Sequence, residues 1–137
     1  MTTTEISPLI ETDTFGKGHP NTRFDYMYRD ADNYKQHTHV VMPGDVTLEQ
    51  AIAIVVGLDD DGGFVPSGVG LPDLQEQMVT DWDEQSDHPY HEIMGISLTA
   101  ESTTIEMTAS EFVVLFAAAD WGLEGARVTL ENEPSAD

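Results

Sequence analysis

The chain has 137 residues, of which 26 are Asp or Glu and only 5 are Lys or Arg, and its formal net charge is −21. This length predicts a single domain large enough to bury a hydrophobic core. The absence of cysteine excludes disulfide scaffolds and thiolate chemistry. Direct nucleic-acid binding, which needs a basic face, is not expected of so acidic a chain. No apolar run reaches the roughly 18 residues that span a bilayer, and no signal peptide is recognisable, so we expect a cytoplasmic protein without a membrane partner.

The acidic residues are spread along the chain, whereas the basic residues are not. Residues 36–126 contain 17 Asp and Glu and no Lys or Arg. Such a composition fits either a disordered acidic chain or a halophilic protein folded in molar salt, where charges act over only about 3 Å. Hydrophobic residues form 39% of the chain and are patterned, which favours the folded alternative. The composition resembles that of proteins from haloarchaea. A DNA mimic is a further alternative, but the spacing shows no ladder of carboxylates.

The N-terminal part of the chain predicts a flexible arm followed by a β-hairpin. Residues 1–21 show no sustained periodicity, although Ile6, Leu9, Ile10 and Phe15 are able to dock on the body. Residues 22–30 alternate, with three aromatic side chains on one face, and residues 34–42 read as a second strand. Turn-forming residues lie between them at positions 31–33, so the two strands predict a hairpin.

The middle of the chain predicts a helix, a long loop and two more strands. Asp45 or Thr47 is a suitable N-cap for a largely buried helix over 47–58, in which Leu48, Ile52, Val55 and Val56 fall together. A long loop at 59–72, a short helix at 72–79 and an acidic loop at 81–87 follow. Residues 90–99 and 103–107 read as a second pair of strands.

The C-terminal part predicts one further helix and an edge strand. Thr108 and Glu111 form a capping box, and Phe112, Leu115, Phe116 and Ala119 then recur at helical spacing over 109–121. Residues 126–131 predict an edge strand, and residues 132–137 a polar tail. We therefore expect a single α+β domain over 22–131, with an antiparallel sheet built from hairpins and two to three helices packed on one face.

A histidine cluster is the most specific local feature. His88 and His91 flank Pro89-Tyr90, and Glu92 follows. Imidazole nitrogens and a carboxylate are typical ligands of Zn²⁺ or another divalent metal, which could activate water for hydrolysis. His37 and His39 lie two apart on a predicted strand and therefore share a face, so they could join the site. The alternative is that these histidines are hydrogen-bonded structural residues.

The scarce cations provide a second candidate site, since Lys17, Arg23, Arg29 and Lys35 all fall within the arm and the hairpin. Arg29 and Lys35 bracket the predicted turn and could bind an anionic or phosphate ligand. Alternatively, the cations pair with Asp25, Asp30 or Glu92 and fix the hairpin.

The segment RFDYMYRDADNYK, residues 23–35, resembles the opening of a family of small uncharacterised prokaryotic proteins with an FDYxYRDxxNYK stretch. That family carries a later DHxxHE segment, similar to residues 87–92 here, and the likeness covers roughly residues 22–95. No activity comes with the resemblance. The resemblance draws attention to two sets of residues. The first is a candidate ligand-binding set, Arg29, Asp30, Asn33, Tyr34 and Lys35, and the second is the candidate metal set, His88, His91 and Glu92. The resemblance gives no support to His37 and His39.

Two function hypotheses follow from these observations. The first is a non-enzymatic accessory or binding domain, whose hairpin and His88–Glu92 segment recognise a protein or a small polar ligand. The second is a small metal-binding protein or metal-dependent hydrolase that uses His88, His91 and Glu92.

Overall fold

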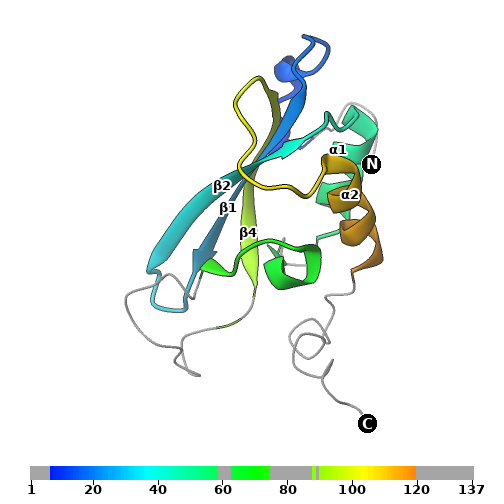
Figure 1. Cartoon of the computed structure of the whole chain (residues 1–137). Helices are drawn as coiled ribbons and strands as arrows, with labels where there is room; N and C mark the ends of the chain where they lie inside the picture. Colours follow the sequence, from blue (N-terminus) through cyan, green and yellow to red (C-terminus); the bar gives the residue numbers. More distant parts are fainter. Residues whose placement is uncertain (1–6, 59–62, 75–87, 89, 120–137) are drawn as a thin grey trace.

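A computed structural model describes residues 7–58, 63–74, 88 and 90–119 of the chain (Figure 1). Its strands are β1 (Asn21–Arg29), β2 (Lys35–Pro43), β3 (Gly63–Phe64) and β4 (His91–Thr99), and its helices are α1 (Leu48–Val56) and α2 (Ala109–Ala118). Two 3₁₀ turns, η1 (Thr12–Thr14) and η2 (Pro66–Val69), complete the described elements. The strands form one antiparallel sheet in the order β2-β1-β4-β3. The predicted α+β class with an antiparallel sheet is confirmed.

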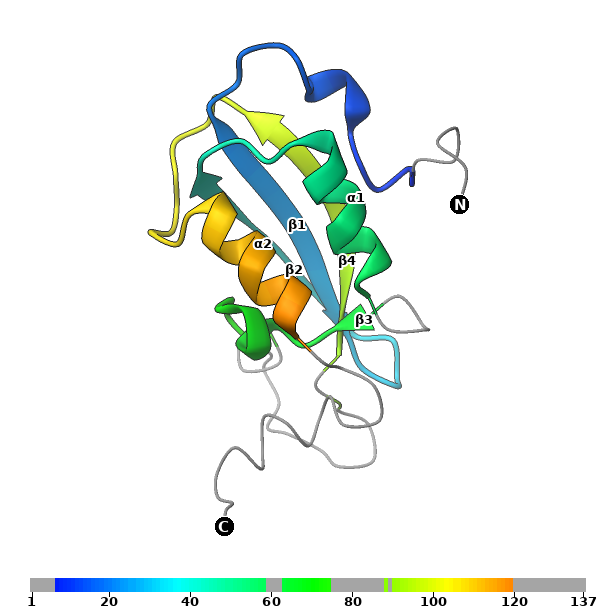
Figure 2. The same ribbon diagram turned by 90° about the vertical axis from the view of Figure 1, so that its right-hand side faces the viewer.

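Strands β1 and β2 form the predicted hairpin, in continuous register from Asn21↔Pro43 to Arg29↔Lys35. The alternation of β1 decides which side chains enter the core. Phe24, Tyr26 and Tyr28 are fully buried on the face that α1 and α2 cover (Figure 2). We call the opposite face of the sheet the outer face. There, Arg23 and Arg29 remain half-buried.

The core is an aromatic cluster between the sheet and α2. The ring of Phe24 lies 4.9 Å from that of Phe112 and 5.6 Å from that of Phe64, both edge-on. Phe116 continues the cluster, 5.5 Å from Phe112 and 5.8 Å from Phe64. Edge-to-face packing of this kind adds roughly 0.5–1.5 kcal/mol per pair to the hydrophobic term. The cluster therefore fixes α2 against the central strand. The Tyr26 hydroxyl, which donates to the carbonyl of Pro72 at 2.8 Å, has a raised pKa because burial disfavours the phenolate.

Both helices begin at capping boxes. The Thr47 hydroxyl accepts from the amide of Gln50, and the Thr108 hydroxyl accepts from the amide of Glu111. In return, the side chains of Gln50 and Glu111 accept from the backbone amides of Thr47 and Thr108. The prediction of which side chains lie inside is wrong for part of each helix. Val56 is 70% exposed and Leu115 is 39% exposed, whereas Ala51 and Ile54 are buried. A helix that is apolar on most sides gives no single direction toward the core, and two layers can cover only part of its circumference.

At both edges of the sheet, the structure differs from the sequence-based prediction. Residues 103–107 do not form the expected strand, and of these five residues only Thr104 bonds to β2. The amide of Thr104 donates to the carbonyl of Val41 at 2.8 Å, and the Thr104 hydroxyl accepts from the amide of Val41 at 2.9 Å. A side chain thus replaces one backbone partner. Part of the expected loop at 59–72 is strand β3 and turn η2, and Phe64 is fully buried. The predicted strand at 126–131, the tail, and all but the first residues of the predicted helix at 72–79 lie outside the described residues.

Part of the N-terminal arm docks on β4, as its apolar residues allowed. Ile10 is buried, and the backbone beside it pairs with Ile96 through Glu11 N to Ile96 O and Ile96 N to Leu9 O, both at 2.9 Å. The hydroxyl of Thr14 accepts from Leu98 N at 3.0 Å. In the described part of the chain, no helix is long and apolar enough to cross a membrane.

The aromatic cluster yields a prediction for α2. Replacing buried Phe112 by Ala should lower the free energy of unfolding by about 3–5 kcal/mol, because a large cavity opens against Phe24. Leu115→Ala on the same helix should cost less than about 1 kcal/mol, since its side chain is partly in solvent. Urea unfolding of both variants at constant salt measures the difference. Equal losses would contradict the packing of α2 described above.

Candidate functional site

The turn between β1 and β2 is built around the carboxylate of Asp30. This side chain is almost buried, and its Oδ1 accepts from the amides of Asp32 and Tyr34, both at 2.9 Å. Asn33 has a φ of 70°, a left-handed conformation that Asn tolerates better than most residues. The Asp30 carboxylate therefore has a structural role in the turn.

Arg29 connects this turn to β4. Its Nε donates to Glu92 Oε2 at 3.1 Å and its Nη1 donates to Asn33 Oδ1 at 2.7 Å. The arginine and the glutamate are both partly exposed, 39% and 44%. Pairs in such positions contribute only about 0–1 kcal/mol to stability. The main consequence of these contacts is orientation, because they hold the end of the hairpin against the first residues of β4.

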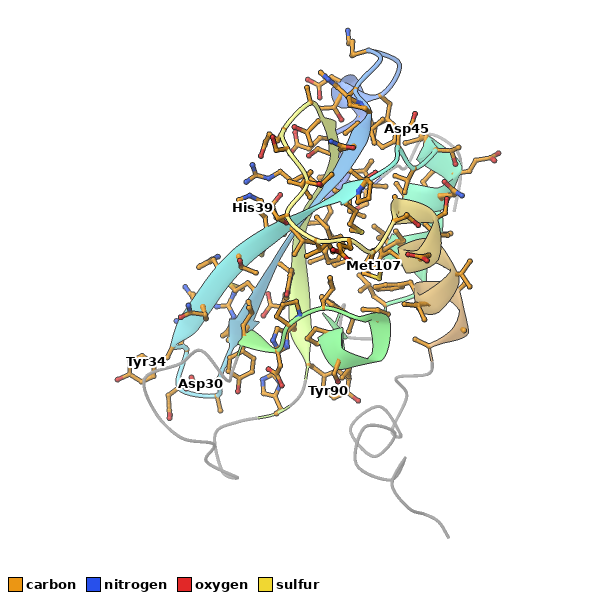
Figure 3. All side chains as sticks on the ribbon, in the orientation of Figure 1. Asp30, Tyr34, His39, Asp45, Tyr90 and Met107 are labelled. Carbon is orange, nitrogen blue, oxygen red and sulfur yellow. The ribbon has the colours of Figure 1, made fainter. Side chains whose placement is uncertain are left out.

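Tyr34 and Lys35 extend from the same end of the hairpin. Tyr34 is 67% exposed and points away from the body of the protein (Figure 3). Lys35 is opposite Arg29 in the strand register, is exposed, and makes no ion pair among the described residues. The structure thus brings Arg29, Asn33 and Glu92 together, places Lys35 beside them, and leaves Tyr34 in solvent.

Both ring nitrogens of His88 are hydrogen-bonded, and one of these bonds ties the residue to the hairpin. Nδ1 accepts from the amide of Tyr90 at 3.2 Å, so Nε2 carries the proton and donates to the carbonyl of Arg29 at 2.9 Å. Its ring lies 5.2 Å from that of Tyr28, whose hydroxyl accepts from the His88 amide at 3.3 Å. His88 therefore joins the end of β1 to the segment before β4.

His91 is a fully buried core residue. Its Nε2 accepts from the amide of Leu74 at 3.0 Å, and its ring packs 5.0 Å from Tyr28 and 6.2 Å from Phe64. Asp73 Oδ1 approaches the same nitrogen at 3.4 Å. Because an amide can only donate, Nε2 bears no proton, and the approach of Asp73 is not an ion pair. His91 thereby anchors the 63–74 segment to β4.

The three residues of the metal hypothesis are thus engaged in different ways. His91 lies in the core, His88 bonds to backbone atoms, and Glu92 binds Arg29. Within the described ranges, no group of three His, Asp or Glu side chains is arranged to hold a metal ion. In the same ranges, every buried side-chain nitrogen and oxygen has a hydrogen-bond partner.

A second ion-pair group occupies the outer face farther along β1. Arg23 contacts both carboxylate oxygens of Asp25 at 3.0–3.2 Å and Glu101 Oε2 at 3.0 Å. The hydrogen bond to Asp25 holds the pKa of Arg23 above its ordinary value, and Arg23 in turn lowers the pKa of Glu101. The sequence indicated the Asp25 pairing but not Glu101, which follows β4 and meets Arg23 only through strand pairing.

His37 and His39 lie with Lys35 on the outer face of β2. They are exposed and face Met27 and Asp25 in the strand register. The sequence signal for this row was the spacing of three basic or ionisable side chains at every second residue.

Comparison of the chain with protein-family models, with curated proteins and with solved structures finds no match. The resemblance of residues 22–95 to a prokaryotic family therefore stays a prediction, and the site is interpreted from its own geometry.

These contacts predict the response to metal. Equimolar Zn²⁺ should shift the melting temperature no more than equimolar Mg²⁺ does, because the described ring nitrogens of His88 and His91 are already hydrogen-bonded. Differential scanning calorimetry in molar KCl measures this. A rise specific to Zn²⁺ that His91→Gln abolishes would contradict the structural role of the histidine and support a metal site.

Proposed function

We propose that the protein is a non-enzymatic accessory or binding domain of the cytoplasm, adapted to high salt, whose interaction site is the end of the β1–β2 hairpin. The observation that supports this most is the largely exposed aromatic ring of Tyr34 on a turn held by Asp30. Tyr and Arg are the residue types that most often dominate binding energy at protein interfaces. The partner is a protein or a small polar ligand.

Pre-organisation supports the same proposal. Ordering one flexible side chain on binding costs roughly 0.5–1.5 kcal/mol, and ordering a loop adds to this cost. At the hairpin end, Asp30 fixes the turn while Glu92 and Asn33 fix the guanidinium of Arg29. Much of the ordering is therefore complete before a partner arrives.

The charge of the outer face supports a partner that approaches from this side. Arg23, Arg29 and Lys35 are balanced there by Asp25, Glu92 and the adjoining Glu101. The outer face is therefore balanced in charge, although the whole chain has a formal net charge of −21. A neutral face lets another acidic molecule approach without the repulsion that a carboxylate-covered surface exerts.

Site-specific crosslinking tests the location of the interaction. With p-benzoylphenylalanine in place of Tyr34, irradiation in cells should yield one discrete adduct, which mass spectrometry can identify. Val114, 66% exposed in a shallow apolar groove with Met107 and Leu115, provides a matched control position and should yield none. An adduct from position 114 alone, or from neither position, would refute the proposed site.

Salt adaptation predicts a dependence of folding on ionic strength. The Debye length rises from about 3 Å at 1 M salt to about 10 Å at 0.1 M, so carboxylate repulsion should loosen the fold below roughly 0.5 M KCl. Circular dichroism melting curves across KCl concentrations measure this effect.

A charge-reduced variant is the control for that experiment. Asp13→Asn, Asp45→Asn and Glu106→Gln together remove three exposed charges that make no ion pair or side-chain hydrogen bond among the described residues, and the variant should stay folded at lower salt than the parent. A cooperative transition that is the same in low and molar KCl would disprove salt adaptation.

A further inference from the structure

The two edges of the sheet are covered unequally. On the β4 side, β3 pairs with residues 91 and 92, and the N-terminal arm bonds to Ile96 and Leu98. On the β2 side, the described residues show a partner beyond β1 for the backbone of Val41 only, and that partner is Thr104. Among the described residues, nothing pairs with the outer edge of β2 from Lys35 to His39. This five-residue stretch is hereafter the free edge.

The register shows which backbone groups the free edge presents. In an antiparallel pair, alternate residues direct both their amide and their carbonyl toward the partner strand or away from it. Val41 directs both groups away from β1, to Thr104, and β1 pairs with β2 without a bulge. Lys35, His37 and His39 have the same parity as Val41, so their amides and carbonyls point outward as well. An added strand would find a complete ladder of donors and acceptors.

The side chains of the same three residues set the chemistry of that strand. Lys35, His37 and His39 all lie on the outer face, and His39 is seen there in Figure 3, on the side away from α1 and α2. A strand added to β2 would place its own alternate side chains about 4.5–5.5 Å from this row. Carboxylates would be complementary to it, because the ammonium of Lys35 would pair with one and the ring N–H groups of His37 and His39 would donate to others, whereas a basic side chain beside Lys35 would be repelled.

We propose that the free edge binds an extended acidic peptide segment of a partner protein, which joins the sheet as a further strand beside β2. This proposal rests on the proposed binding function and names the partner's chemistry. Main-chain hydrogen bonds provide the affinity, as in other cases of strand addition, and the row of Lys35, His37 and His39 selects for carboxylates at every second position. A second copy of this chain fits less well, since an edge-to-edge dimer would offer no carboxylate to Lys35 and the two histidines and would bring two highly acidic bodies together.

A lysine on an edge strand also has a protective function, since such residues discourage unwanted strand pairing. Protection requires only that strands be rejected, whereas the proposal requires that acidic strands be accepted more readily than basic ones. The two therefore differ in the response to peptides of opposite charge.

The test uses a capped seven-residue peptide in which Glu alternates with Thr, titrated into the full-length ¹⁵N-labelled protein in 1 M KCl. The amide signals of residues 35–39 should shift, and the same peptide with Lys in place of Glu should bind more weakly, by the difference in side-chain contacts that remains in 1 M KCl. N-methylation of one alternate set of peptide amides should abolish binding, whereas methylation of the other set should not. These arms leave the protein itself unaltered.

Two variants at one position separate the backbone from the side chain. His37→Pro removes an outward amide, which edge strands tolerate, and should weaken binding about tenfold or more. His37→Ala keeps the amide and should stay within about threefold of the parent, since only one exposed side-chain contact is lost.

Shifts that map elsewhere, equal binding of both peptides, or unaltered binding to His37→Pro would overturn the proposal. So would a concentration-dependent dimer that His37→Pro dissociates, since a second copy would then occupy the edge. If a discrete crosslink at Tyr34 is found together with any of these results, the proposed binding of an acidic strand is refuted but the proposed binding function is not. Failure of both experiments would refute the binding function.

Discussion

The alternation of side chains along β1 is the constraint on which the rest of the structure depends. β1 is a central strand, paired with β2 on one side and β4 on the other. One of its faces presents Phe24, Tyr26 and Tyr28 to the helices, and the other presents Arg23 and Arg29 to the outer face. A register slip of one residue would exchange the two sets and bury charged groups without partners. The aromatic core and the arginines of the outer face are thus two results of one periodicity.

The same constraint connects the histidines to the hairpin. Tyr28, fixed inward by the alternation, lies beside both His88 and His91. His91 then holds Leu74, and His88 holds the carbonyl of Arg29. The described part of the DHxxHE segment therefore joins the end of the hairpin to the start of β4. In this arrangement the exposed groups at the hairpin end are held by buried ones.

The sequence predicted the local elements of the fold well. Period-two alternation identified β1 and β4, residues 34–42 were predicted as the strand that is β2, and an N-cap residue and a capping box located the starts of α1 and α2. It did not predict β3 or the pairing of Thr104 with Val41, because each depends on a contact with a distant part of the chain. The exposed positions of Val56 and Leu115 were also missed, since apolar residues on most sides of a helix do not show which side meets the sheet.

The candidate site was predicted in part. The proximity of Arg29, Asn33 and Glu92 agrees with the residues singled out from the sequence, and the pairing of Arg29 with Glu92 was one of its alternatives. The role of Asp30 inside the turn and the burial of His91 could not be read from residue types, because acid and imidazole groups serve structure and chemistry equally well. The free edge of β2 appears only when its neighbours in the sheet are known.

Amide hydrogen exchange along β2 tests the central claim most directly, that the hairpin carries an unoccupied edge on a well-ordered strand. Measured in molar KCl, Gln36, Thr38 and Val40 should be protected by β1, and Val41 by Thr104. Lys35, His37 and His39 should exchange rapidly, so that protection alternates along the strand. Protection of His37 and His39 equal to that of Thr38 would contradict the account, because the edge would then already be covered.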